Sequence, residues 1–160
     1  MSVDLDQHIL DLKLELPPAP EPAGVYCPAL IVGEFIYVSG HVPFLMDGKS
    51  CVQGRVGEDL SVEEAVKAAR MTGCAVLATL KNALGSLNKV KRIVKTFGMV
   101  NTNSQTIKGM ECVTVVNGFS NLMMEVFGPE FGVGARSAVG MATLPMNTPV
   151  EVEAVFQITD

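Results

Sequence analysis

Arg136 is the residue whose surroundings most favour ligand binding. It lies in the run Gly134–Val139, where small neighbours leave room beside its side chain. A guanidinium is a planar fork that grips a carboxylate or a phosphate through two parallel hydrogen bonds. The alternative is a solvated arginine in a surface salt bridge, which is the commoner situation for this residue type. The sequence therefore makes Arg136 a candidate anion anchor.

Glu151 and Glu153 are two acids in the otherwise apolar run Val150–Val155. Alternate residues of a strand point to opposite faces, so both carboxylates are expected on one face and Val152 on the other. One carboxylate is then a candidate for orienting a water molecule or acting as a general base. Repulsion between the two predicts a raised pKa for one of them. A polar, solvent-facing strand edge is the alternative, and which acid faces a ligand stays open.

Tyr26 and Ser39 belong to the first predicted hairpin. The segment Ser39–Pro43 is typical of a strand that breaks where its backbone approaches another group, although an ordinary turn is the alternative. His41 has no paired nucleophile and is a weak candidate for a base. The four cysteines form no CxxC pair, so neither a structural zinc site nor a disulfide framework is expected. No cysteine has the context of a reactive thiol.

Hydrophobic spacing indicates the elements that position these residues. Ser61–Glu64 is a capping box, from which a helix runs to Leu84 and stops at Gly85. Gly33 suits the first central position of a II′ hairpin turn. The expected elements, in chain order, are a helix in 2–14, a proline-rich connector, strands 29–32 and 35–39, a short strand near 50–53, the helix 62–84, a strand 90–100, a helix 109–127 closed by Gly128-Pro129, and strands 135–142 and 150–158.

The composition suits one globular domain. The chain has 160 residues, of which 48% are hydrophobic, and a net charge of −5. This acidic balance argues against a protein that binds a nucleic-acid backbone. The N-terminus does not look like a signal peptide and no apolar run is long enough to span a membrane, so we expect a cytoplasmic protein. Residues 1–22 are expected to form the helix and connector, and residues 23–160 the main domain.

Three segments, taken together, resemble the YjgF/RidA family, also called the endoribonuclease L-PSP or translation-inhibitor family. They are residues 24–43, the helix opened by Asp59-Leu60-Ser61, and residues 135–154. The last is the most specific, because its arginine, its Leu-Pro pair and its Glu-x-Glu keep the family spacing. The N-terminal helix and the segments 56–60 and 117–120 look like a longer-chain subgroup of that family.

The resemblance implies an α+β, chorismate-mutase-like fold, in which a mixed β-sheet carries two helices on one face. It implies a homotrimer with a central β-barrel and ligand clefts between subunits. In the enzymatic branch, 2-imino acids such as 2-iminobutanoate and 2-iminopropanoate are hydrolysed to 2-keto acids and ammonia without a metal or cofactor. Arg136 matches the arginine that binds the substrate carboxylate, and Glu151 matches the acid that positions the attacking water. The matching substrate-binding positions are Tyr26, Ser39, Asn117 and Ala138.

Two departures from the family pattern bear on function. Ala138 stands where many family deaminases have cysteine, and His41 stands where they have glutamine. Both imply a pocket of different shape, while the arginine and the acid remain. The alternatives are an endoribonuclease that inhibits translation, a non-enzymatic small-carboxylate-binding or chaperone-like trimer, and a hydrolase for another carboxylated enamine or a carbamate.

Overall fold

The computed structural model describes residues 4–159 and has the expected α+β architecture. Its elements are α1 (Leu5–Asp11), β1 (Ala29–Val32), β2 (Phe35–His41), α2 (Val62–Leu84), β3 (Val90–Asn101), α3 (Met110–Phe131), β4 (Ala135–Met141) and β5 (Val150–Ile158), with single 3-10 turns at Leu87–Lys89 and Pro145–Asn147.

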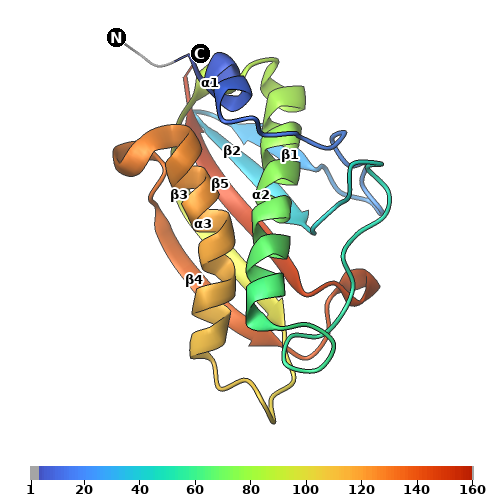
Figure 1. The fold of residues 1–160 in the computed structure, drawn as a ribbon. Helices are drawn as coiled ribbons and strands as arrows, with labels where there is room; N and C mark the ends of the chain where they lie inside the picture. Colours follow the sequence, from blue (N-terminus) through green and yellow to red (C-terminus); the bar gives the residue numbers. More distant parts are fainter. Residues whose placement is uncertain (1–3, 160) are drawn as a thin grey trace.

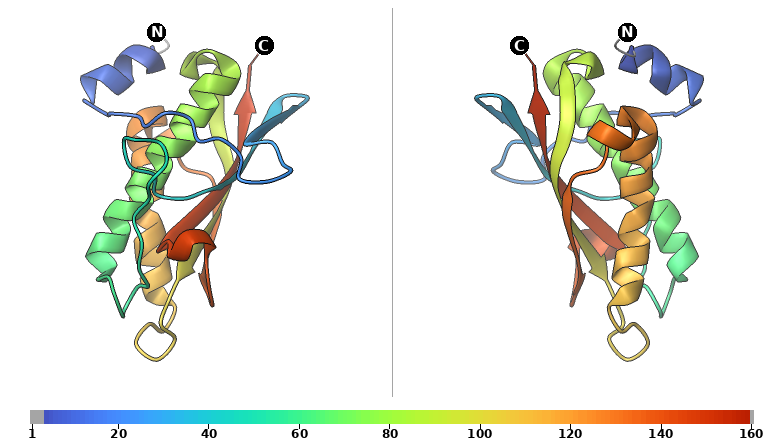
Figure 2. Two further views of the ribbon diagram at one scale, coloured as in Figure 1. Left: turned by 90° about the vertical axis from the view of Figure 1, so that its right-hand side faces the viewer. Right: turned by 90° about the vertical axis from the view of Figure 1, so that its left-hand side faces the viewer.

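The five strands form one mixed sheet in the order β1-β2-β5-β3-β4. Neighbouring strands are antiparallel except β3 and β4, which are parallel. A parallel pair needs a long crossover, and α3 supplies it. α2 and α3 cover one face of the sheet, which leaves the opposite face open (Figure 1, Figure 2). The expected arrangement of a mixed sheet with two helices on one face is confirmed.

The core lies between the helices and the covered face. The capping box at Ser61 and Glu64 starts α2, and Gly85 ends it in the left-handed conformation, as the sequence predicts. The buried face of α2 begins with small residues such as Ala65 and Ala69 and becomes bulkier towards Leu80. This gradation lets the first turns of α2 approach α3 and the sheet closely. Among the described residues, no helix is both long and apolar enough to cross a bilayer.

The two predicted hairpin strands pair with Val32 opposite Phe35. Gly33 has a φ of 58°, which a II′ turn requires at this position. The predicted strand near 50–53 is wrong: only an isolated bridge joins Phe44 and Cys51. The helix predicted to close at Gly128-Pro129 instead kinks at Gly128 (φ 78°, ψ 165°) and continues to Phe131. Proline is favourable in the first turn of a helix, so Pro129 begins the last piece rather than stopping it.

The N-terminal helix is shorter than predicted and packs against the main body. It spans Leu5–Asp11, and the first two residues of the expected range lie outside the described residues. Ile9 is buried against the core, and Asp6 forms a 3.0 Å ion pair with Lys81 of α2. From α1 the connector, residues 12–28, runs past α2 to β1 (Figure 1).

Candidate functional site

The strand register places Arg136 and Glu151 on opposite faces of the sheet. Arg136 of β4 is opposite Thr96 of β3, and Thr96 is opposite Ala154 of β5. Thr96 and Ala154 are both buried under the helices, so Arg136 is on the helix-covered face. Glu151 is paired with Met99, which lies three residues further along β3 and therefore on the other face. Within one chain, the candidate anion anchor and the candidate acid cannot contact the same small molecule.

Arg136 is held against α3 by its end nitrogens. Nη1 donates to Oδ1 of Asn117 at 2.8 Å and to Oγ of Ser120 at 3.0 Å, and Nη2 donates to the carbonyl of Val113 at 3.4 Å. A guanidinium has five N–H groups, so the Nε–H and one Nη2–H remain. These two N–H groups are available to an external anion such as a carboxylate.

The charge of Arg136 has no acidic partner in the described part of the chain, because no carboxylate lies within 4.0 Å of it. Partial burial lowers the pKa of Arg136 from its ordinary value. Because an arginine starts so far above neutral pH, the guanidinium keeps its charge under ordinary conditions. A half-buried cation with two remaining N–H donors can therefore bind an external carboxylate.

Asn117 and Ala138 lie near Arg136. Asn117 comes from α3 and orients the guanidinium, while Ala138 lies two residues along β4 on the same face and packs against the core. Ser120 was missed by sequence reasoning. Ser120 lies three residues after Asn117 on a predicted helix. This spacing places the Ser120 hydroxyl and the Asn117 amide on one helix face.

A second group of candidate residues lies at a cavity of about 500 Å³, where the C-terminal end of β2 is beside the N-terminal end of β5. Tyr26, Ser39, Glu151 and Glu153 all line it. Both acids point to the open face of the sheet, as the alternation predicts, and Glu151 is the more buried of the two. The four residues come from the connector, β2 and β5, so strand pairing brings together positions more than a hundred residues apart.

Glu151 has the perturbed ionisation that the sequence suggests for one acid of the pair. Burial, and secondly the negative charge of Glu153, raise the pKa of Glu151 above the ordinary glutamate value. The carboxylate of Glu151 lies directly against Gly40, where any Cβ would overlap it. The register between β2 and β5 shifts between Val38 and His41. β2 does not end at Ser39, as the sequence predicts, but continues to His41, and the register shift within it makes room for the acid.

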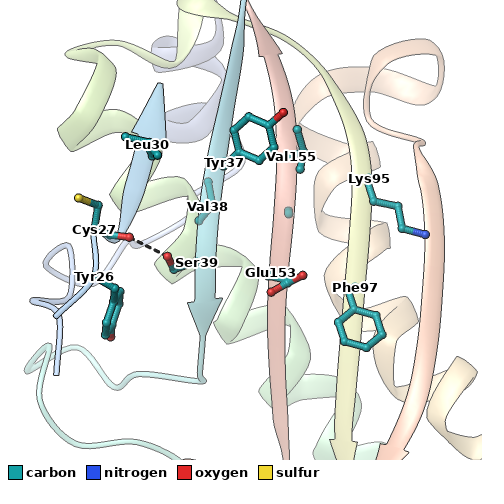
Figure 3. A pocket seen from close by; sticks show the side chains of 11 residues that line it. Tyr26, Cys27, Leu30, Tyr37, Val38, Ser39, Lys95, Phe97, Glu153 and Val155 are labelled. Carbon is teal, nitrogen blue, oxygen red and sulfur yellow. Dashed lines mark hydrogen bonds between the residues drawn. The ribbon is translucent and has the colours of Figure 1, made fainter. Parts of the chain in front are cut away.

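The hydroxyl groups of Ser39 and Tyr26 are both oriented by backbone groups. Ser39 Oγ donates to the carbonyl of Cys27 at 2.6 Å (Figure 3), which leaves its oxygen lone pairs available. Tyr26 accepts the backbone N–H of Ala23 at 3.1 Å, which leaves its own O–H available. The site can thus offer one hydroxyl acceptor and one hydroxyl donor beside the acids.

A hollow of about 660 Å³ lies beside this cavity on the open face of the sheet, and Figure 3 shows its lining. Tyr26, Ser39 and Glu153 line both spaces and form their boundary. Lys95 and Phe97 of β3 stand on its far side. The two spaces form a continuous concave surface that another chain or a ligand can contact.

His41 is buried and structural rather than catalytic. The residue is 3% exposed; Nδ1 lies 2.7 Å from the carbonyl of Ser39 and Nε2 lies 2.7 Å from Oγ1 of Thr79. A carbonyl only accepts, so Nδ1 carries the proton and Nε2 accepts the Thr79 hydroxyl. Burial lowers the pKa of His41, which keeps the ring neutral. The ring therefore ties β2 to α2.

Metal binding is not indicated in the described range 4–159, where no group of three histidine, cysteine, aspartate or glutamate side chains is placed to hold an ion. The chemistry that the arrangement supports is binding of a carboxylate at Arg136, together with proton transfer to or from water at Glu151.

Comparison with known proteins identifies the family. A family model described as "YjgF/chorismate mutase-like, putative endoribonuclease" matches residues 6–156. Protein TCP17 of Trypanosoma cruzi is 38% identical over 149 residues, which are 93% of this chain and 91% of that protein. The crystal structure of Atu1372 from Agrobacterium tumefaciens, described as of unknown function, has a TM-score of 0.85 and 38% identity over 98% of this chain and 94% of that chain.

A more distant relative has a named activity. The 2-iminobutanoate/2-iminopropanoate deaminase of Dermatophagoides farinae is 26% identical over 148 residues, which are 91% of this chain and 94% of that protein. The family model covers most of the chain and includes α1 from its second residue, which extends the sequence resemblance from residue 22 back to residue 6. The chain therefore belongs to the YjgF/RidA family, and its fold is the chorismate-mutase-like fold of that family.

Proposed function

We propose that the protein hydrolyses 2-imino acids to 2-keto acids and ammonia in clefts between the subunits of a homotrimer. The observation that carries the proposal is the division of the site between two faces. Arg136 offers a carboxylate fork at the edge strand β4, and Glu151 offers a proton-transfer group in a cavity on the opposite face. A complete site needs Arg136 of one copy beside Glu151 of another.

The open face of the sheet supports association. Leu30, Tyr37 and Val139 are 54%, 47% and 36% exposed on that side. A sheet normally has its apolar face covered, so exposed apolar side chains on an open sheet face favour an interface. β4 is an edge strand, so its outer side is free to approach a second copy. Three copies, as the family resemblance implies, close such contacts into a ring.

The reaction balances with water alone. Water adds to the imine carbon, the resulting carbinolamine loses ammonia, and the carbon–nitrogen double bond becomes a carbon–oxygen double bond. Glu151 accepts a proton from the attacking water and returns it to the departing nitrogen. A raised pKa suits this double role, because a base works best when its pKa lies near the working pH.

The remaining residues orient the reactants. Arg136 binds the substrate carboxylate, and Asn117 fixes the guanidinium through its 2.8 Å hydrogen bond. Tyr26 and Ser39 supply a hydroxyl donor and an acceptor beside the imine. Ala138 keeps the volume beside Arg136 small and apolar. An imine is already reactive, so orienting it and a water molecule is the main contribution required of the protein.

An imine-trapping assay tests the activity. An amino-acid oxidase generates the 2-imino acid beside semicarbazide, and active protein lowers the rate of semicarbazone formation. Arg136→Ala should abolish the effect, because losing a paired, partly buried arginine costs about 2–5 kcal/mol of binding. Wild-type protein that leaves semicarbazone formation unchanged for every amino acid tried would exclude the deaminase.

Subunit mixing tests the divided site. Arg136→Ala and Glu151→Gln are each expected to be inactive alone. In trimers formed by coexpressing equal amounts, roughly a quarter of the clefts combine an intact Arg136 with an intact Glu151, given random assembly in a cyclic oligomer. Activity should return to about that fraction of wild type. No recovery, despite mixed oligomers seen by native mass spectrometry, would show that each site lies within one chain.

A further inference from the structure

The connector before β1 forms a wall of the cavity that contains Glu151. Residues 20–24 line that cavity together with β2 and β5. The connector is bonded to β2 beside the cavity, because Ser39 donates from Oγ to the carbonyl of Cys27 at 2.6 Å and from its N–H to the carbonyl of Pro28 at 3.0 Å. Within the connector, the N–H of Ala23 donates to the hydroxyl of Tyr26 at 3.1 Å. Proline fixes its own φ, so this segment loses little further freedom when it lines a site. The wall is therefore built in advance of any ligand.

Much of the remaining lining forms an apolar wall. Pro20 and Pro22 of the connector, Phe44 after β2, and Pro145 and Met146 before β5 contribute it. Glu21 of the connector also lines the cavity, and no lysine or arginine is among the described residues that do so. The three acids at positions 21, 151 and 153 give the cavity a negative charge. A ligand group beside the apolar wall gains by leaving water, whereas an anionic group is repelled.

Met146 is held over the cavity by a constrained turn. Its φ is 55°, a conformation that is uncommon for a long side chain, and its side chain is 50% exposed. The neighbouring Asn147 fixes the turn, because its carbonyl accepts the N–H of Gly54 at 2.8 Å and its side chain accepts from Asn101 at 3.0 Å. Unusual backbone conformations persist where the surroundings hold them, and they cluster at ligand sites.

We propose that the connector and the Pro145–Met146 turn form a side-chain subsite that selects 2-imino acids with bulky apolar side chains. This inference rests on the proposed function, since it places the carboxylate at Arg136 of a second copy and the imine carbon beside Glu151. The substrate side chain then lies between Pro22, Phe44 and Met146. A cavity of about 500 Å³ accommodates a leucine- or phenylalanine-derived side chain beside the reacting atoms.

The test compares imines that differ only in the side chain. The kcat/KM for the leucine-derived imine should exceed that for the glutamate-derived imine by at least tenfold. Met146→Ala should lower kcat/KM for the leucine-derived imine by roughly tenfold and that for the alanine-derived imine by a much smaller factor. Met146→Lys should reverse the preference towards the glutamate-derived imine. The matched control is Met124→Ala, an exposed methionine of α3 that does not line the cavity.

Binding of the keto-acid products separates this inference from the proposed function. Calorimetry should show that 4-methyl-2-oxopentanoate binds more tightly than 2-oxoglutarate, and that Met146→Ala and Pro22→Ala remove the difference. If no imine is hydrolysed but this binding preference holds, the deaminase proposal fails and the subsite stands. If imines are hydrolysed at equal rates whatever their side chain, or if the two keto acids bind equally or not at all, the subsite is excluded.

Discussion

The backbone of Gly40 lies directly against the carboxylate of Glu151. No Cβ fits at Gly40 without overlapping that carboxylate. Gly40 is also within the register shift of β2, where the chain stops following the regular ladder. The absence of a side chain at Gly40 therefore determines where the carboxylate of Glu151 can lie.

Gly40→Ala should reduce kcat for imine hydrolysis by roughly 100-fold, because moving a catalytic group by about 1 Å has this order of effect. Arg136 is on the other face and is unaffected, so KM should change much less than kcat. Steady-state kinetics in the trapping assay measure both. The midpoint of thermal unfolding, measured on the same variant, separates displacement of Glu151 from loss of the fold. A folded Gly40→Ala variant with the kcat of wild type would contradict this role for Gly40.

The acidic side of the pH profile should report Glu151. The ionised carboxylate is the base, so activity is lost as the pH falls through its pKa. Because burial and the charge of Glu153 raise that pKa, the loss begins at a higher pH than an ordinary glutamate would give. Glu153→Gln removes one of the two causes and should move the acidic limb of kcat/KM to lower pH. Glu63→Gln, an exposed acid at the start of α2, should leave it in place.

Much of the fold was accessible from the sequence because local signals agreed with one another. The capping box at Ser61, the stop at Gly85 and the II′ turn at Gly33 each have a local physical cause, and all three are present. The piece near Cys51 follows the Asp47-Gly48 turn, yet it lacks a partner strand long enough to make a ladder. Strand formation depends on distant pairing, so sequence pattern alone overestimates it there.

The site was less accessible than the fold. Alternation placed Glu151 and Glu153 on one face, which the structure confirms. Nothing local to Arg136 shows that it and Glu151 are on opposite faces, because that relation depends on the register of β3 with both β4 and β5. The cavity wall made by the connector was missed for the same reason. A proline-rich run indicates an extended chain, but it does not indicate which part of the fold that chain packs against.

Ser120→Ala should weaken carboxylate binding without abolishing it. Ser120 is one of two acceptors on Nη1 of Arg136, at 3.0 Å, and Asn117 remains as the other. A hydrogen bond to a charged group contributes about 1.5–3 kcal/mol, so the Kd for a 2-keto acid should rise roughly 10- to 100-fold. Calorimetric titration measures the Kd. Ser120→Thr keeps the hydroxyl and should bind nearly as wild type; equal weakening in both variants would assign the effect to packing.

Thr79→Val should destabilise the fold by about 1–3 kcal/mol. The substitution keeps the shape of the side chain but removes the hydroxyl that donates to Nε2 of buried His41 at 2.7 Å, which leaves that nitrogen without a partner. For a chain of this size the midpoint of thermal unfolding should fall by roughly 2–12 °C. Thr72→Val is the matched control on α2. The Thr72 hydroxyl donates to the carbonyl of Ala68 within the helix, so its loss leaves no buried donor unpaired. Similar midpoints for the two variants in calorimetry would show that the His41–Thr79 contact contributes no more than an ordinary helix hydroxyl.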